Sequence, residues 1–409
     1  MVDYDPLSEA IIEDPYPIYQ MLRAESPVHY LEKYDAWALA CFEDIWQASM
    51  DEQHLTATRG TSWPYLVTKS IPALENVNHM DPPAQRKLRA EIAPFFMPRR
   101  VREVEPSIRE FVTECIDAFI ERGEADFVGE LAQLVAARVA CAAFGFPEAD
   151  TAYMVDLSKR FLSRDDVAEE ASDAGVDAFG EMISYLEGLA AERRSYSGPI
   201  ENIFDVYLRT EIEGERLDDE RCGQHLIVPL IGAVETFPKV FATAILRLGQ
   251  YPDQRAELLR DPRRIPRALR ECLRYDMPTQ FLMRSVKRDF TIRDRRLCEG
   301  QSLMFLYASG NRDEREFDDP DTFDIHRSSP RILSFGHGIH RCLGSHFAEM
   351  EGKVLLEEVL RRMPDYEVDE QNAVWERMEF IRGYKLLPVH FSRSRTGASD
   401  LPQLGKRER

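Results

Sequence analysis

The stretch that decides the fold is Phe335-Gly336-His337-Gly338-Ile339-His340-Arg341-Cys342-Leu343-Gly344. It places one cysteine in a loop punctuated by glycines, directly before an apolar, helix-prone run over residues 343–356. A thiolate at a helix N-terminus is stabilised by unpaired backbone N–H groups and by the positive end of the helix dipole. Glycines permit a close approach that a side chain would block. The stretch therefore predicts a sulfur presented to the metal of a flat cofactor, with Phe335 shielding it from water.

A structural cysteine in a turn is the alternative interpretation, and for a lone cysteine it would be favoured. The spacing changes this comparison. At a glycine frequency of about 7%, three glycines at fixed offsets arise by chance in roughly three of ten thousand windows. The added Phe335, His340 and Cys342 make coincidence negligible.

These ten residues resemble the haem-binding signature of the cytochrome P450 superfamily, Phe-Gly-x-Gly-x-His-x-Cys-x-Gly, at every fixed position. The resemblance covers nearly the whole chain. It implies a haem b whose iron is bound by the Cys342 thiolate, with Phe335 and Gly344 beside it. It also implies a mostly α fold with small β-sheets, in which the haem lies between a central helix and the helix after the thiolate. We expect one large domain over residues 1–391 and a polar C-terminal tail over residues 392–409.

A second informative segment is uncharged over residues 226–234 and continues as Glu235-Thr236-Phe237-Pro238. A helix that is apolar all round is buried, and an unpaired carboxylate inside it is costly. Pro238 has no N–H, so the carbonyl of Val234 loses its helical partner. The sequence predicts that the helix opens over residues 234–238, with an interior-proline cost of about 3 kcal/mol.

This segment is similar to the central-helix motif of the family, Ala/Gly-Gly-x-Asp/Glu-Thr-Thr. Gly232, Ala233, Glu235 and Thr236 occupy the matching places, whereas Ala233 replaces a glycine and Phe237 replaces a second threonine. The resemblance implies that Glu235 and Thr236 deliver the two protons that dioxygen cleavage needs. The alternative is a kinked core helix with one satisfied glutamate.

Three further residues match a structural motif of the family. Glu271 and Arg274 are three residues apart and share one helix face. The family joins such a pair to a later arginine, for which Arg327 is in the right place. The resemblance implies that these three residues brace the thiolate loop.

Haem propionates need cations or strong hydrogen-bond donors. His340, Arg284 and Arg89 match propionate contacts of the family. Gln85 stands where many members have histidine, and its amide can still donate. For the two arginines the alternative is an ordinary surface charge.

The resemblance places the substrate pocket along the segment of residues 55–77, the central helix, the residues after Glu271 and Arg274, and a C-terminal turn. The candidates are Trp63, Tyr65, Asn78, Val228, Ile231, Gly232, Phe237, Gln280, Leu282 and Ile381. This set is largely apolar and aromatic and lacks a cation for a carboxylate. It suggests a small neutral lipophile, such as a terpenoid or an aromatic compound.

A basic cluster stands out in an acidic chain: Arg86, Lys87, Arg89, Arg99, Arg100 and Arg102. Small ferredoxins are acidic, so complementary charge would steer docking. The resemblance implies a [2Fe-2S] ferredoxin as electron donor, since no flavin or ferredoxin domain is fused to the chain. A solvated helix face is the alternative.

Composition narrows the remaining choices. The 409 residues carry a net charge of −20, which argues against nucleic acid and anionic membranes as partners. Seven cysteines without paired spacing indicate a reduced compartment. No signal-peptide pattern or run of eighteen apolar residues is found, so we expect a cytoplasmic, bacterial-type monomer without a membrane anchor.

The coarse pattern predicts strands near residues 28–30, 36–40 and 290–297, and helices over residues 42–50 and 101–196. Asp81-Pro82-Pro83 should open a helix. Residues 55–77 and 308–327 should be irregular.

The function expected from the resemblance is insertion of one oxygen atom from O2 into a lipophile, with electrons from NAD(P)H through a reductase and the ferredoxin. Two alternatives stay open. A hydrogen-peroxide-dependent peroxygenase would lack the acid–alcohol pair and carry an arginine there. A non-catalytic haem-binding protein would need neither the pair nor the basic cluster.

Overall fold

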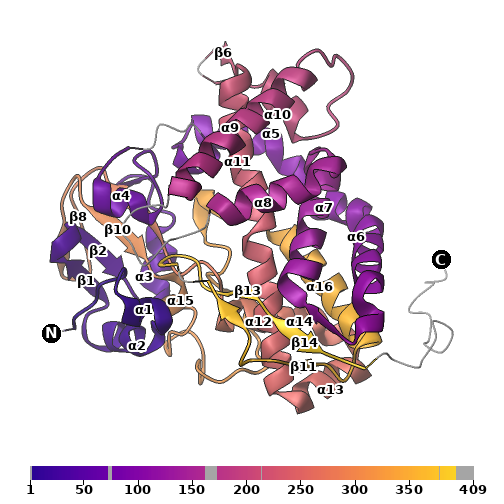
Figure 1. Cartoon of the computed structure of the whole chain (residues 1–409). Helices are drawn as coiled ribbons and strands as arrows, with labels where there is room; N and C mark the ends of the chain where they lie inside the picture. The colour runs from indigo at the N-terminus through magenta and orange to yellow at the C-terminus, as the bar shows by residue number, and fades with distance from the viewer. Residues whose placement is uncertain (1, 72–75, 162–172, 213, 377, 393–409) are drawn as a thin grey trace, which may run out of the picture.

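The computed structural model describes residues 2–71, 76–161, 173–212, 214–376 and 378–392, and it describes the backbone but not the side chain of Trp63. Figure 1 shows two regions: strands and short N-terminal helices gather on one side, and long helices fill the other. The N-terminus lies at the strand-rich side.

Helices make up most of the described chain. The longer ones are α2 (Tyr16–Glu25), α6 (Pro98–Phe119), α7 (Gln133–Phe144), α8 (Thr151–Phe161), α9 (Asp173–Arg193), α11 (Asp219–Val234), α12 (Thr236–Gln250), α14 (Ile265–Tyr275) and α16 (Ser345–Arg362). The shorter ones are α1 (Glu9–Glu13), α3 (Phe42–Ala48), α4 (Trp63–Thr68), α5 (Ala84–Ile92), α10 (Ile203–Arg209), α13 (Pro252–Arg260) and α15 (Tyr307–Gly310).

A five-stranded sheet has the order β1-β2-β10-β7-β3 and is antiparallel except where β10 runs parallel to β2. Its strands are β1 (Val28–Leu31), β2 (Ala36–Leu39), β10 (Ser302–Phe305), β7 (Leu282–Val286) and β3 (Leu55–Thr56). A three-stranded sheet joins β11 (Glu367–Val368), β14 (Pro388–His390) and β4 (Glu124–Asp126). Three two-stranded pairs are β5 (Glu211–Ile212) with β6 (Glu215–Arg216), β8 (Phe290–Ile292) with β9 (Arg295–Leu297), and β12 (Val374–Trp375) with β13 (Tyr384–Leu386).

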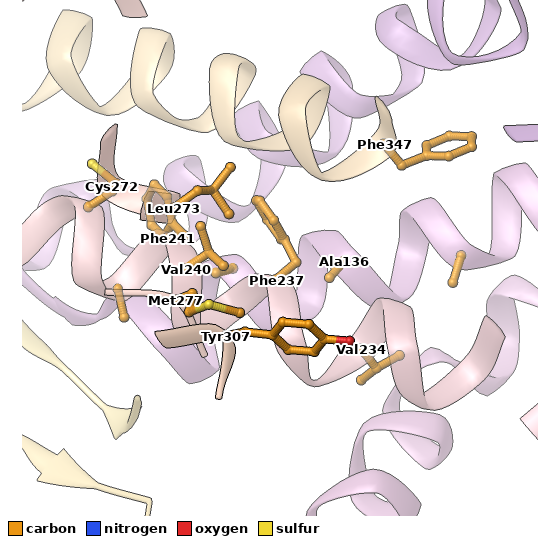
Figure 2. Close-up of a cluster of buried hydrophobic side chains, with 14 of the residues drawn as sticks. Ala136, Val234, Phe237, Val240, Phe241, Cys272, Leu273, Met277, Tyr307 and Phe347 are labelled. Atoms are coloured by element: carbon orange, nitrogen blue, oxygen red, sulfur yellow. The ribbon is translucent and has the colours of Figure 1, made fainter. Parts of the chain in front are cut away.

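The core is apolar because the central helices bury almost every side. α12 packs against α14 and α16, and α11 packs against α7 and α9. Figure 2 shows Phe237, Val240 and Phe241 of α12 meeting Leu273 of α14. α14 contributes a stripe at helical spacing, since Ile265, Ala268, Leu269 and Cys272 are all buried.

Most predicted elements are confirmed. The strands near residues 28–30 and 36–40 are β1 and β2, and the predicted strand over 290–297 is the β8–β9 hairpin. α5 follows the two prolines directly. Helices dominate residues 101–196, although a strand (β4) interrupts them and residues 162–172 lie outside the described chain.

The prediction that residues 55–77 and 308–327 are irregular throughout was wrong in two places. The first segment contains β3 and the six-residue helix α4, where Ser62 precedes a proline at the second helical position. α15 extends into the start of the second segment. Both helices are short, and patterns of four to six residues carry little periodicity.

Two helical stretches in the described part of the chain are long and apolar enough to cross a membrane, by length and composition alone: Phe127–Phe144 and Asp219–Gln250. Within them, 72% and 67% of the most apolar window is buried inside the protein. Such burial is typical of the core helices of a folded protein.

Candidate active site

The Cys342 loop is a tight turn closed by backbone hydrogen bonds. The N–H of Cys342 donates to the carbonyl of Phe335 at 2.8 Å, and the N–H of Gly336 donates to the carbonyl of Leu333 at 2.8 Å. Gly338 has φ +71°, and a Cβ there would lie 2.3 Å from the carbonyl oxygen of Ser49. Only glycine fits at this position.

The Cys342 side chain is accessible, although protein surrounds it. Burial raises the pKa of its thiol, while backbone hydrogen bonds involving Gly344 and Ser345 and the charges of Arg89 and Arg341 lower it. α16 begins at Ser345, so the sulfur lies at a helix N-terminus as predicted.

A cluster of cationic side chains surrounds His340. Burial, Arg284, Arg89 and His79 together lower the pKa of His340 to about 3. Burial also lowers the pKa of Arg89 and of Arg284. The three predicted propionate contacts are therefore brought together.

The two arginines donate to backbone carbonyls rather than to carboxylates. Arg89 donates to the carbonyl of Arg341, and Arg284 donates to the carbonyl of Met283 at 2.6 Å. The charge of the Asp81 carboxylate raises the pKa of Arg284, but Asp81 pairs with Lys287, whose Nζ lies 3.6 Å from Asp81 Oδ2. Partly buried cations without a close carboxylate fit a dianionic ligand such as the two haem propionates.

Gln85 supports the same loop from α5. Its side-chain amide donates to the carbonyl of Ile339 at 2.8 Å, and its Oε1 is buried without a partner among the described residues. The amide thus positions the backbone next to His340. A propionate contact from Gln85 stays a prediction.

The central helix opens where the sequence predicts. α11 ends at Val234, α12 begins at Thr236, and Glu235 is the junction. The Thr236 hydroxyl donates to the carbonyl of Gly232 at 2.8 Å. Pro238 is therefore the third residue of a new helix, where a missing N–H costs little. The interior-proline cost expected from the sequence does not apply.

Glu235 is buried, and its carboxylate turns toward three neighbours. Gln133 Nε2 donates to Oε1 at 3.2 Å, and Lys239 Nζ lies 3.4 Å from Oε2. Burial raises the pKa of Glu235, Lys239 and Gln133 lower it, and Glu376 raises it. A carboxyl with opposing influences of this kind is suited to hold and release a proton.

Glu271, Arg274 and Arg327 meet as predicted. Glu271 accepts from Arg274 at 2.7 and 2.8 Å and from Arg327 at 3.2 Å. Arg274 also donates to the carbonyl of Asn311 at 2.9 Å. Asn311 in turn accepts from the N–H of Leu333 at 2.7 Å and donates to Ser334 at 2.9 Å. This chain of bonds ends at the Cys342 loop.

Four of the predicted substrate residues share accessible faces. Val228, Ile231 and Gly232 follow one face of α11 at helical spacing, and none of them is buried, whereas Ile227 and Leu230 are. Leu282 and Arg284 alternate with buried residues along β7 and face the same side of its sheet. These residues are accessible parts of α11 and β7.

Two other substrate candidates, Phe237 and Gln280, have buried side chains. Phe237 is 4% exposed and packs in the core of Figure 2, because the first turn of α12 directs it toward α14. Gln280 is buried, donates to the carbonyl of Met277 at 3.0 Å and lines a small cavity with Tyr19 and Arg382. For these two residues, a position in the substrate pocket stays a prediction.

Three further candidates lie on other elements, and the short helix Val77–His79 that holds Asn78 contacts α11. Ile381 packs with Met378 in a small separate cluster. Tyr65 is buried in the main core, and Asn78 is exposed. The side chain of Trp63 lies outside the described part of the structure.

The basic cluster, on α5 and the start of α6, reaches the Cys342 loop through Arg89, which donates to the carbonyl of Arg341. Arg86 pairs with Glu52 at 2.5 Å, and Arg99 and Arg100 both approach Glu103, at 3.3 and 3.4 Å. Arg102 and Arg341 are exposed. Arg341 adds a charge that the sequence analysis did not assign to the cluster, although its place next to Cys342 could have indicated it.

Sequence reasoning also missed His79, Asn311 and Lys239. The first two lie far from their partners in sequence, so no local pattern points to them. Lys239 was visible as a charge four residues after Glu235 on a predicted helix, which is a spacing that brings side chains together.

Comparison with known proteins agrees with this geometry. The cytochrome P450 family model matches residues 167–388. Cytochrome P450 123 of Mycobacterium tuberculosis is 35% identical over 387 residues, which cover 94% of this chain and 96% of that protein. The chain belongs to the cytochrome P450 family. Another relative, the monooxygenase PikC of Streptomyces venezuelae, is 31% identical over 97% of this chain and 95% of its own.

Solved structures of P450 proteins have the same fold. CalO2 superposes with a TM-score of 0.84 at 29% identity, covering 96% of this chain and 100% of its own. The fold class predicted from the sequence is thus confirmed, and the chain is a P450 monooxygenase with a haem–thiolate cofactor. The described residues fit that cofactor, since they offer an accessible thiol and a group of cations without close carboxylates.

Proposed function

We propose that this P450 inserts one oxygen atom of O2 into a small lipophilic substrate, with electrons from NAD(P)H through a reductase and a [2Fe-2S] ferredoxin. The proposal rests most on one observation: an accessible Cys342, a cationic cluster around His340 and a helix opening at Glu235 and Thr236 occur in one chain. When bound, the haem supplies the iron at which dioxygen is reduced.

The chain's own residues divide the remaining tasks. Cys342 would bind the haem iron through its thiolate, with Phe335 and Gly344 beside it. Arg89, Arg284, His340 and Gln85 hold the propionates. The Thr236 hydroxyl keeps the helix open by bonding to the Gly232 carbonyl, and it orders the protons that Glu235 supplies.

A lipophilic substrate agrees with the accessible face of α11. Val228, Ile231 and Gly232 carry neither charge nor hydrogen-bonding side chains. A 29% identical relative in Mycobacterium tuberculosis is named beta-dihydromenaquinone-9 omega-hydroxylase. A small terpenoid or aromatic compound remains the substrate class that we propose.

Electron supply would come through the basic cluster. Arg102 and Arg341 are both exposed, and Arg341 directly precedes Cys342, in a protein whose net charge is −20. An acidic ferredoxin would be attracted to this patch and repelled by most of the remaining surface. In this proposal the protein acts as a cytoplasmic monomer.

Turnover under labelled dioxygen tests the function. Purified protein with NADPH, a reductase and a ferredoxin should place one labelled oxygen atom in the product and the other in water. Turnover with hydrogen peroxide alone, at the same rate and independent of Glu235 and Thr236, would favour a peroxygenase. Absence of any product across a lipophilic compound library that shifts the haem spin state would favour a non-catalytic binder.

A further inference from the structure

A chain of buried charges leads away from the helix opening to another part of the molecule. Lys239 Nζ lies 3.4 Å from Glu235 Oε2 and 3.9 Å from Glu376 Oε2. The side chains of Glu235 and Lys239 are 4% and 5% exposed, whereas that of Glu376 is 15% exposed. Exposure therefore rises toward Glu376, which directly follows β12.

The Glu235 carboxylate is directed into this chain. Both of its oxygens are engaged on this side, by Gln133 and Lys239. The neighbouring Thr236 hydroxyl donates to the Gly232 carbonyl instead. A proton that reaches Glu235 from solvent therefore has a charged path along Lys239.

The β12–β13 hairpin packs against the aliphatic part of the Lys239 side chain at Gly383. A Cβ at Gly383 would lie 2.6 Å from Lys239 Cβ and 2.9 Å from its Cγ. The N–H of Glu376 donates to the carbonyl of Gly383 at 2.8 Å, which joins the two residues across the hairpin. Glycine at position 383 thus permits the contact that keeps Glu376 close to Lys239.

Stability alone does not explain this group of charges, since Glu235 and Lys239 are buried and Glu376 is only 15% exposed. Replacing a buried ion pair by apolar residues of similar volume is often neutral or stabilising, because desolvation offsets the attraction. This group also contains two carboxylates, Glu235 and Glu376, but only one cation, Lys239. A role in proton transfer at the helix opening would explain why these charged groups lie there.

We propose that Lys239 and Glu376 form the solvent-side half of the proton supply to Glu235, with the β12–β13 hairpin as its entrance. This inference rests on the proposed monooxygenase function. The Lys239 ammonium gives a proton to the Glu235 carboxylate. The resulting amine takes a proton from the Glu376 carboxyl, directly or through one water molecule, and Glu376 regains it from solvent. No electrons move in these transfers.

Glu376→Gln is the most direct test, because the side-chain amide would keep the shape of the carboxyl but not carry the proton. Product formed per NAD(P)H should fall about tenfold, which is less than the ~10²–10⁴-fold effect of a general acid–base group because water can partly replace this one. Hydrogen peroxide should rise to match, and the pH profile of coupling should change. Glu376→Asp should recover most of the loss.

Gly383→Ala tests the contact without removing a titratable group. It should displace the hairpin from Lys239 and lower coupling in the same direction as Glu376→Gln. Glu367→Gln is the control, since it removes an equal charge from an exposed position in β11. The control should leave coupling unchanged.

A readout independent of turnover is the infrared carboxylic-acid band of Glu235 in the carbon monoxide complex, assigned by its loss in Glu235→Gln. The pH at which this band disappears should move upward in Lys239→Met and be restored in Lys239→Arg. If the pH at which the band disappears is the same in Lys239→Met as in the wild type, the proposal is overturned.

Two activity outcomes separate this proposal from the proposed function. If Thr236→Ala and Glu235→Gln uncouple the enzyme while Glu376→Gln and Gly383→Ala do not, protons enter elsewhere and only the route is wrong. If none of the four variants changes coupling, the route and the acid–alcohol mechanism are both wrong.

Discussion

Replacing Lys239 with methionine should destabilise the folded protein by removing the partner of a buried carboxylate. Lys239 and Glu235 are 5% and 4% exposed at 3.4 Å separation, so solvent cannot replace the lost ammonium. Breaking one side of such a pair costs about 3–5 kcal/mol. For a chain of 409 residues with about 2.1 cal/mol/K of unfolding entropy per residue, this corresponds to a Tm lower by about 4–6 °C.

The loss should depend on pH in a defined direction. Burial holds the pKa of Glu235 above its usual range, and Lys239 counteracts this increase. Between the ordinary carboxyl pKa of about 4.3 and the raised value, the folded state binds more protons than the unfolded state, so stability falls as pH rises. Lys239→Met raises the folded pKa further. The difference from the wild type should therefore be smallest below a pH of about 4.3 and grow toward neutral pH.

Urea unfolding of the haem-loaded protein at several pH values measures this effect. Lys353→Met is the matched control, because Lys353 pairs with Glu105 at 3.3 Å but is 31% exposed, and such pairs contribute about 0–1 kcal/mol. The double variant Glu235→Gln, Lys239→Met should recover most of the stability. A loss below about 1 kcal/mol in Lys239→Met, or strictly additive single variants, would refute the reasoning.

Three further predictions concern the same site. Thr236→Ala should keep haem and substrate binding but divert reducing equivalents to hydrogen peroxide; an unchanged product yield per NAD(P)H would count against the role of the hydroxyl. Arg99→Glu with Arg100→Glu should slow reduction by a ferredoxin, most at low ionic strength where screening is least, without altering the substrate-induced spin shift. The same reduction rate and salt dependence would place the donor elsewhere. Pro238→Ala should change the free energy of unfolding by less than about 1 kcal/mol, because a new hydrogen bond and the greater freedom of the unfolded chain offset one another. The same variant should lower the coupling of electrons to product, because its N–H provides a partner for the Val234 carbonyl and closes the helix. Full coupling in this variant would contradict that explanation.

The sequence predicted what depends on neighbours along the chain. The glycines around Cys342, the Glu271–Arg274 pair and the opening before Pro238 are all local patterns, and each has the predicted geometry. The loop and its helix follow from backbone constraints that a few residues impose.

Side-chain direction after the helix break was not predictable in the same way. Phe237 follows Thr236 directly, yet its ring packs in the core because the helix restarts at Thr236. Asn311 and Glu376 reach the site from loops and hairpins far away in sequence. Their roles come from tertiary contacts, which no spacing in a single sequence reveals.

The central claim is that Cys342 presents the thiolate to the haem iron, and the carbon monoxide difference spectrum of the reduced protein tests it most directly. The wild type and a Cys298→Ser control, altered at an exposed cysteine, should both show the strongly red-shifted Soret band of thiolate ligation. Cys342→His should lose that band even where haem is retained. A thiolate-type spectrum in Cys342→His would contradict the assignment and the account of the site built on it.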